Sequence, residues 1–409
     1  MLKSFILRNH CNNLTNVVRS SLVRYNSSSS SSNSNNKNES TTNIKPKTAI
    51  VMLNLGGPAK PEDVEPFLTR LFSDRDIFKL PFQKWAGKFI AKRRSPAVRK
   101  LYEAIGGGSP IRMWTERQGT AMAQQLDRLS PSTAPHKFYI GFRYADPLID
   151  ETLDAMKHDG VERAIAFTQY PHFSCTTTGS SLNNLWKSLE SKGMDSDFQW
   201  SIIDRWHLHD GFIDAVASKV SAALARYKVE AGKIGDQTEP VVVFSAHSLP
   251  MRTVERGDPY PNEVAATVAA VINKLGGENA PQHMLCWQSK VGPLPWLVPK
   301  TSDTIERLAK SGRNAIVVPI AFTSDHIETL SEIDIELQHL AKENGMKLLL
   351  RSESLNDDPK LTSALADIVL QHMKSGKSIQ HHNQYKLKCP GCIDETGHYC
   401  RTIRNPIVL

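Results

Sequence analysis

The sequence lacks long apolar runs and has few cysteines. None of its 409 residues lies in a stretch near the roughly 18 uninterrupted apolar residues that a membrane-spanning helix needs, and the longest apolar segments are short ones such as residues 315–322. We therefore expect a soluble or peripherally attached protein. Six cysteines are too few for a disulfide scaffold in a chain of this length, so their positions matter more than their number.

Acidic residues are absent from residues 1–38. This segment carries the cations Lys3, Arg8, Arg19, Arg24 and Lys37, and a Ser/Asn tract occupies residues 26–38. Such a composition is typical of a mitochondrial transit peptide, so we expect residues 1–44 to be a transit peptide and linker. A disordered polar N-terminus without a targeting role is the alternative. Because much of the net charge of +8 is local, it gives no reason to expect a nucleic-acid partner.

Short β-branched or apolar runs alternate with helical patterns between residues 47 and 355. This alternation predicts parallel sheets covered by helices. The expected strands are residues 48–55, 137–143, 163–169, 241–245, 283–287, 314–322 and 347–351. We expect an α/β fold of two doubly wound Rossmann-like domains, residues 45–230 and 231–375, with an active-site cleft between them. A cysteine-bearing extension, residues 376–409, follows.

Polar residues follow most of these strands, at the carboxyl ends where open α/β sheets bind ligands. They lie in residues 54–58, 141–144, 169–171, 245–248, 287–290 and 323–326. The fingerprints of nucleotide binding are missing, because neither residues 56–58 nor residues 106–109 give the spacing of a dinucleotide motif or a phosphate loop. We therefore set nucleotide binding aside.

Four carboxylates are spaced three, four and four residues apart: Asp325, Glu328, Glu332 and Glu336. This spacing would line them along one face of a helix. Like charges four residues apart destabilise a helix by about 0.2–0.5 kcal/mol per pair, so the row favours a compensating cation. A solvated acidic face is the alternative, since an apolar face is also present at Ile327, Leu330, Ile333 and Leu337.

Three segments resemble the signature segments of ferrochelatases. They are Phe-Ser-Ala-His-Ser-Leu-Pro at residues 244–250, Trp-Gln-Ser-Lys-Val-Gly-Pro at residues 287–293, and Ala-Phe-Thr-Ser-Asp-His-Ile-Glu-Thr-Leu at residues 321–330. The resemblance spans roughly residues 47–374. It implies an enzyme that inserts ferrous iron into protoporphyrin IX to form protohaem, the terminal step of haem biosynthesis.

This chemistry requires removal of two pyrrole protons, bending of the macrocycle and removal of water from the ion. A neutral imidazole accepts protons near pH 7, and carboxylates suit both the protons and the hydrated cation. A lone histidine at a strand end, such as His247, is more often structural. The resemblance instead implies that His247 abstracts porphyrin protons or contacts the metal, and that Glu328, with His326 beside it, faces the porphyrin. A path for metal or protons is then implied at Asp325, Glu332 and Glu336.

A tetrapyrrole is a flat apolar disc with two propionates, so its pocket needs an apolar wall and a few basic or hydroxyl groups. The resemblance implies that Leu55, Tyr102, Arg143 and Trp296 line this pocket. Ordinary core packing is the alternative for Leu55 and Trp296.

Aromatic and basic residues alternate in residues 77–94, and Phe82, Trp85 and Phe89 share one helical face. This composition suits docking on an anionic membrane, and a surface helix packed on its own domain is the alternative. Resemblance to the hydrophobic lip of the family favours contact with the matrix side of the mitochondrial inner membrane. Homodimerisation is likewise implied by the resemblance alone.

The tail contains Cys389, Cys392 and Cys400, and Cys175 lies far upstream. Four thiolates could hold zinc or an iron–sulfur cluster, and composition does not choose between them. The resemblance implies a [2Fe-2S] cluster with one upstream and three C-terminal ligands. The gap between Cys392 and Cys400 is longer than in the animal pattern.

Two other functions fit part of the sequence, besides a metal-sensing iron–sulfur protein, which would draw on the cysteine tail alone and leave the acidic row unexplained. One is a chelatase for another divalent metal or another tetrapyrrole, because zinc and cobalt compete well for nitrogen and oxygen ligands. The other is a non-catalytic haem or porphyrin carrier, against which the presence of both His247 and Glu328 argues. His207 and His209 form a weaker candidate for a surface metal site.

Overall fold

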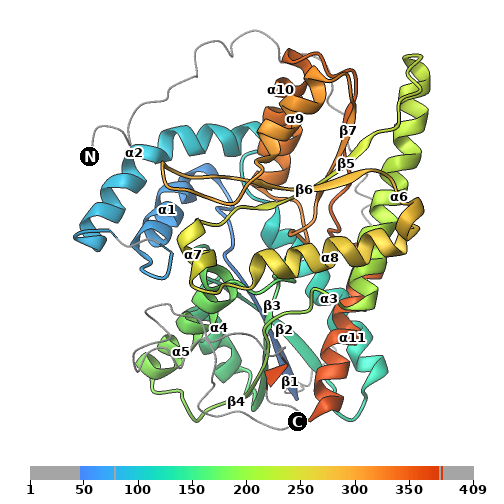
Figure 1. The fold of residues 1–409 in the computed structure, drawn as a ribbon. Helices are drawn as coiled ribbons and strands as arrows, with labels where there is room; N and C mark the ends of the chain where they lie inside the picture. Colours follow the sequence, from blue (N-terminus) through green and yellow to red (C-terminus); the bar gives the residue numbers. More distant parts are fainter. Residues whose placement is uncertain (1–46, 78–79, 377–378, 381–409) are drawn as a thin grey trace, which may run out of the picture. The chain divides into compact units, whose positions relative to one another are not determined.

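The first sheet has five parallel strands. The computed structural model describes residues 47–77, 80–376 and 379–380. The strands are ordered β2-β1-β3-β4-β9, and the first four along the chain are labelled in the lower part of Figure 1. They are β1 (Thr48–Asn54), β2 (His136–Phe142), β3 (Arg163–Thr168), β4 (Gln199–Ile203) and β9 (Ile379–Gln380).

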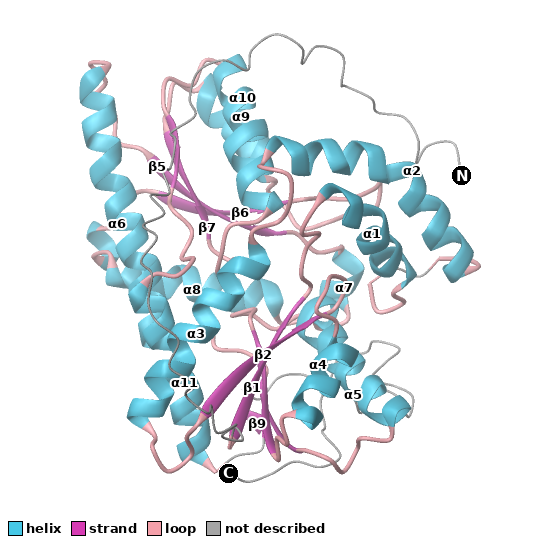
Figure 2. Cartoon of the chain, turned by 180° about the vertical axis from the view of Figure 1, so that it is seen from behind, coloured by secondary structure: helices cyan, strands magenta, loops and turns pink. Residues whose placement is uncertain are grey.

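Both faces of the first sheet are covered by helices. Ile50 and Met52 of β1 join one core with residues of α3, whereas Val51 and Leu53 join another core with residues of α4 and α5. Successive side chains of a strand point to opposite faces, so a strand buried on both sides is apolar throughout. Figure 2 shows α3 and α11 on one side of this sheet, and α4 and α5 on the other. The bounds are α3 (Ile111–Leu129), α4 (Ile149–His158), α5 (Ser180–Lys192) and α11 (Pro359–Ser375).

The second sheet has four parallel strands in the order β6-β5-β7-β8. Val242 and Phe244 of β5 pack into a core with α6 and α8, while Val241 and Val243 pack toward α9 and α10. The strands are β5 (Val241–His247), β6 (His283–Gln288), β7 (Ala315–Pro319) and β8 (Leu349–Arg351). The helices are α6 (Asp210–Lys233), α8 (Tyr260–Lys274), α9 (Thr301–Lys310) and α10 (Gln338–Glu343).

The remaining elements lie mostly beside the strand ends. They are the 3-10 helices η2 (Pro61–Asp63) and η4 (Gly277–Asn279), the π-helices η3 (Cys175–Gly179) and η5 (Glu328–Leu337), and α1 (Val64–Ser73), α2 (Gln83–Ala104) and α7 (Met251–Glu255). Within the described residues, no helix is both long enough and apolar enough to cross a bilayer.

The prediction of two parallel sheets covered by helices is confirmed. All seven expected strands form, and β7 ends at Pro319 rather than at residue 322 because the chain turns there. Two strands, β4 and β9, were not expected. The described end of the chain returns to the first sheet, since β9 pairs with β4 and α11 packs against α3. The division into domains at residue 230 stays a prediction.

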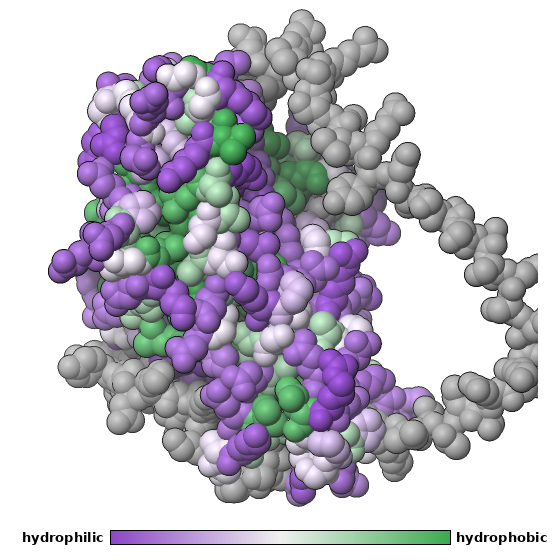
Figure 3. Space-filling view, turned by 90° about the vertical axis from the view of Figure 1, so that its right-hand side faces the viewer, coloured by the Kyte–Doolittle hydropathy of each residue, from purple (hydrophilic) through white to green (hydrophobic). Residues whose placement is uncertain are grey.

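The molecular face in Figure 3 has separate hydrophobic areas set among hydrophilic residues. Scattered apolar residues of this kind are normal on a folded protein, whose large apolar side chains lie mainly in the cores. The two most exposed of the described large apolar side chains, Phe82 and Trp85, lie at the start of α2.

Candidate active site

The carboxyl ends of β5 and β6 bring polar side chains together. β5 ends at His247, whose neighbour across the sheet is Gln288, the last residue of β6. Ser289 follows with a φ of +62°, a left-handed conformation that non-glycine residues adopt at some energetic cost. This turn directs both the N–H and the hydroxyl of Ser289 toward the start of η5.

His247 and Glu328 form an ion pair. The distance from His247 Nδ1 to Glu328 Oε2 is 2.9 Å, and the two side chains are 38% and 27% exposed. Burial lowers the pKa of His247, but the charges of Glu328 and Glu332 outweigh burial and raise it. Burial also raises the pKa of Glu328, but His247, His326 and Ser289 outweigh it and lower this pKa to about 2. These shifts favour a proton on the imidazole and a charged carboxylate on Glu328.

Glu332 is joined to Glu328 through Ser289. The Ser289 hydroxyl donates to both carboxylates, and the Ser289 N–H donates to Glu332 Oε1 at 2.8 Å. Burial and the nearby charge of Glu328 raise the pKa of Glu332. Two neighbouring carboxylates thus have pKa values displaced in opposite directions, which is a common mark of acid–base sites.

Gln288 holds Glu328 and Glu332 in place through two hydrogen bonds. Its side chain is buried, and Nε2 donates to Glu332 Oε2 and to the backbone carbonyl of Glu328, both at 3.1 Å. Its carbonyl accepts from the buried hydroxyl of Ser245, which also contacts Thr301. Sequence analysis did not single out Gln288 or Ser289. Their place at a strand end within a signature segment is the signal that could have found them.

Leu55 and Tyr102 were both predicted to line the pocket. Leu55 directly follows β1, and Tyr102 lies in α2. The Leu55 N–H donates to Asn54 Oδ1 at 2.7 Å and to the hydroxyl of Tyr170. Tyr102 and Tyr170 have raised pKa values, first because of burial and second because of the charge of Glu328. Tyr102 and Tyr170 therefore lie within electrostatic reach of Glu328. Tyr170 was missed, although it lies in a predicted strand-end segment.

Arg143 is held by an acidic neighbour. Its Nη2 lies 2.9 Å from Asp74 Oδ2, and the two side chains are only 20% and 4% exposed. The same oxygen of Asp74 accepts from Ser180 Oγ and from the hydroxyl of Tyr144. Arg143 thus lies in a satisfied polar cluster at the end of β2.

Trp296 and His326 flank the ion pair. The rings of Trp296 and His247 are nearly perpendicular, with centroids 6.5 Å apart. The buried Trp296 Nε1 has no hydrogen-bond partner among the described residues. The His326 ring lies 4.5 Å from the Phe322 ring, and its Nδ1 is 3.0 Å from the Ser324 carbonyl.

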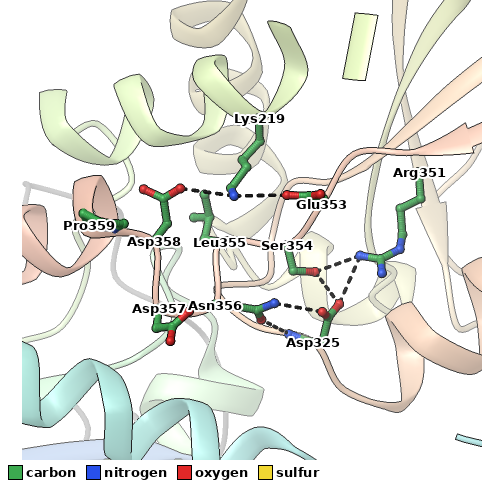
Figure 4. Close-up of a pocket in the computed structure, with 10 residues that line it drawn as sticks. All are labelled: Lys219, Asp325, Arg351, Glu353, Ser354, Leu355, Asn356, Asp357, Asp358 and Pro359. Carbon is green, nitrogen blue, oxygen red and sulfur yellow. Dashed lines mark hydrogen bonds and ion pairs between the residues drawn. The ribbon is translucent and has the colours of Figure 1, made fainter. Parts of the chain in front are cut away.

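The expected row of four carboxylates is only partly assembled. The helix is a π-helix that begins at Glu328, so Asp325 precedes it. Asp325 bonds Arg351 in a polar pocket (Figure 4), whereas Glu336 is exposed and its one hydrogen bond, to Ser331, is 3.5 Å long. Glu328 and Glu332 are therefore the two carboxylates that the structure brings together with His247.

Of the predicted cluster ligands, only Cys175 lies within the described residues; Cys389, Cys392 and Cys400 lie outside them. Cys175 begins η3, and its N–H donates to Asp258 Oδ2 at 2.9 Å. In the described part of the chain, no group of three or more His, Cys, Asp or Glu side chains is arranged to hold a metal ion.

His207 is buried rather than exposed, so the idea of a surface metal site at this residue was wrong. Its Nδ1 lies 3.5 Å from Glu263 Oε2.

The predicted transit segment, residues 1–44, also lies outside the described residues.

Two parallel sheets covered by helices, with a histidine and carboxylates at the strand ends, define the chain as an α/β enzyme. A model of the family described as Ferrochelatase matches residues 47–373. The mitochondrial ferrochelatase of Dictyostelium discoideum is 65% identical over 89% of this chain and 89% of its own length. That of Homo sapiens is 51% identical over 86% of this chain and 81% of its own length. The chain belongs to the ferrochelatase family, and these relatives support a mitochondrial location.

Proposed function

We propose that this chain inserts ferrous iron into protoporphyrin IX to form protohaem, with the chemistry at His247 and Glu328. Family membership supports the reaction, which is that of a metal chelatase of the lyase class. The observation that carries the residue assignment is the 2.9 Å contact between His247 and Glu328, with the pKa values of the two groups displaced in opposite directions.

Metallation releases two pyrrole protons, so the site must accept both. Before substrates bind, Glu328 stabilises the imidazolium form of His247 and so raises its pKa. A ferrous ion beside Glu328 would replace the imidazolium as its counter-charge and thereby lower the pKa of His247. Neutral His247 then accepts one pyrrole proton. Glu332, whose pKa is raised, accepts the other.

The test is anaerobic incubation of the purified protein with Fe(II) and protoporphyrin IX, followed by loss of porphyrin fluorescence. We expect the wild type to consume porphyrin and His247→Ala to be slower by about 10²–10⁴-fold, the usual contribution of a general base. Equal rates for the two proteins would show that His247 is not the proton acceptor. No consumption by the wild type would contradict the proposed reaction.

The porphyrin would lie against Leu55, Tyr102 and Trp296, and a propionate would reach Arg143. The Trp296 ring lies 6.5 Å from the His247 ring, centroid to centroid, so an aromatic wall stands beside the proposed proton acceptor. The close contact between Arg143 and Asp74 means that a propionate at Arg143 competes with an existing carboxylate. We therefore expect a propionate to displace or share this ion pair.

The lip, residues 77–94, would dock on the matrix side of the inner membrane. Phe82, Trp85 and Phe89 are 87%, 72% and 57% exposed, and the rings of Trp85 and Phe89 stack at 5.8 Å. Exposed lysines at positions 84, 88 and 92 accompany them. Basic side chains around exposed aromatic rings suit a surface of anionic lipid, from which an apolar porphyrin could be taken.

A [2Fe-2S] cluster would be held by Cys175, Cys389, Cys392 and Cys400. The thiolate chemistry of the set suits such a cluster, which would be a resident cofactor distinct from the iron substrate. An absorption spectrum of the purified protein tests this, because a bound cluster is coloured and zinc is not.

The proposal of a homodimer depends on family resemblance, and sedimentation of the purified protein would test it.

A further inference from the structure

Asp325 is bound by four hydrogen-bond donors, one of which is a guanidinium. Its Oδ1 accepts from Arg351 Nη1 at 3.0 Å, Ser354 Oγ at 2.6 Å and Thr329 Oγ1 at 3.0 Å, and its Oδ2 accepts from Asn356 Nδ2 at 2.9 Å. Three donors crowd Oδ1 and one binds Oδ2, so most of the acceptor sites of this carboxylate are occupied. The guanidinium of Arg351 would also repel a divalent cation. This residue therefore differs from Glu328, three positions later.

Arg351 joins Asp325 to the body of the π-helix. Besides its contact with Asp325, it binds Asp334 in a two-point arrangement, with distances of 2.7 and 2.8 Å. Asp334 lies within η5, and Arg351 ends β8. Its side chain is only 14% exposed. The Arg351 guanidinium thus binds Asp325, three residues before η5 begins, and Asp334 inside η5. Glu328 lies between these two residues in the sequence.

Asn356 fixes the same turn from the other side. Its side-chain Oδ1 accepts from the Asp325 N–H at 2.8 Å, and its Nδ2 donates to the Asp325 carboxylate (Figure 4). Asn356 has a φ of +47°, in the left-handed region. Its backbone carbonyl accepts from Gln118 Nε2 of α3 at 2.7 Å, and its N–H donates to the Thr323 carbonyl. A left-handed conformation of a non-glycine residue persists where surrounding contacts hold it in place. Residues in such strained conformations are common near active sites.

We propose that Asp325 is a positioning residue for Glu328: together with Arg351 and Asn356, it sets the direction in which η5 leaves the turn at residues 323–326. This inference rests on the proposed function at His247 and Glu328. It replaces the expectation that Asp325 belongs to a metal path. The consequence is that the Glu328 carboxylate stays within hydrogen-bond distance of His247 Nδ1.

The test uses Asp325→Asn and Asn356→Gly. The first removes the charge and keeps the shape, and the second removes the amide while glycine still allows the left-handed backbone. Glu353→Gln is the matched control, because Glu353 lines the same pocket but bonds Lys219 rather than Asp325. For each protein, the pKa of His247 is measured by NMR with labelled histidine, and kcat and the KM for Fe(II) are measured anaerobically.

We expect Asp325→Asn to lower the pKa of His247, because the carboxylate that raises it moves away. We also expect kcat to fall by about ten- to a hundredfold, in line with small misplacements at catalytic sites. Asn356→Gly should act in the same direction, and Glu353→Gln should change neither quantity.

A raised KM for Fe(II) with an unchanged His247 pKa would overturn the proposal and support a metal path. Unchanged values throughout would also overturn it. If Asp325→Asn does not fold, Asn356→Gly decides by the same two readouts. Inactive wild-type protein would contradict the proposed function, while a His247 pKa that differs between wild type and variants would still support positioning.

Discussion

The carboxyl ends of the two sheets differ in how their polar groups are paired. At the end of the second sheet, His247 and Glu328 are partly exposed and bond each other, with their pKa values displaced. At the end of the first sheet, Arg143 is held by a buried Asp74, and the Leu55 N–H is bonded to neighbouring side chains. The second sheet thus presents groups that can exchange protons, whereas the first presents groups held in fixed positions.

Charge balance leads to the same distinction. His247 contacts Glu328, and Ser289 joins Glu328 to Glu332, so two carboxylates lie beside one imidazole and favour an added cation. The ion pair of Arg143 and Asp74 is already balanced. We therefore assign metal and proton chemistry to the second sheet and substrate positioning to the first, and the predictions below test this division.

The largest expected effect is on the rate of iron insertion. Glu328→Gln removes the carboxylate that pairs with His247 and leaves the shape unchanged. We expect the single-turnover rate of metallation to fall by about 10²–10⁴-fold, as for other acid–base residues. Glu353→Gln is the control. A rate near that of the wild type would mean that the division between the two sheets is wrong.

A second expected effect is on stability at the end of the first sheet. Arg143→Ala leaves Asp74, whose side chain is 4% exposed, without its cation. We expect the free energy of unfolding to fall by about 3 kcal/mol, because an unpaired buried charge is costly. Urea denaturation measures this loss.

Arg112→Ala is the control for that measurement, since Arg112 and Glu116 form an exposed pair. Its expected cost is at most about 1 kcal/mol. Equal losses in the two variants, or a changed pKa of His247 in Arg143→Ala, would contradict the comparison.

The third expected effect is a pH dependence of stability. The pKa of His247 is raised, so its contribution is complete below the ordinary value of 6.5 and is lost as the pH rises through the folded-state pKa. The pKa of Glu328 is lowered to about 2, so its contribution is complete above 4.5 and is lost as the pH falls toward 2.

The stability difference between wild type and Glu328→Gln should therefore be largest between pH 4.5 and 6.5. Denaturation at a series of pH values measures this difference. A difference that does not change with pH would contradict the ion pair.

The smallest expected effect on stability is in the lip. Trp85→Ala changes a side chain that is 72% exposed, so the free energy of unfolding should change by no more than about 0.5 kcal/mol. Binding to vesicles of anionic lipid should nevertheless weaken, because an exposed aromatic anchor is lost. Co-sedimentation with such vesicles measures this, and unchanged binding would remove the support for membrane docking at Trp85.

Most of the fold could be predicted from the sequence, because a strand buried on both faces is a continuous apolar run, as in β1. β4 was missed because it has five residues and includes Ser201, which interrupts the apolar pattern. β9 was missed because two residues give no periodicity. The type of the helix from Glu328 was also hidden, since residues four apart share a side of both an α-helix and a π-helix.

The site was less predictable where distant residues decide it. In the sequence, Asp325 and Glu328 both belong to the predicted row of carboxylates. In the structure, however, Asp325 bonds Arg351 and Asn356, which lie 26 and 31 residues further along the chain. The left-handed turn at Ser289 likewise has no signal in residue type. His247 was found through the resemblance, because its position at a strand end is equally typical of a structural histidine.

The most direct measurement is the pKa of His247, determined by NMR in the wild type and in Glu328→Gln. The central claim is that these two side chains share one proton at the end of the second sheet. We expect a pKa above 6.5 in the wild type and a lower pKa in the variant, where burial remains and the opposing charge is gone. A wild-type pKa at or below 6.5, or the same value in both proteins, would contradict the claim.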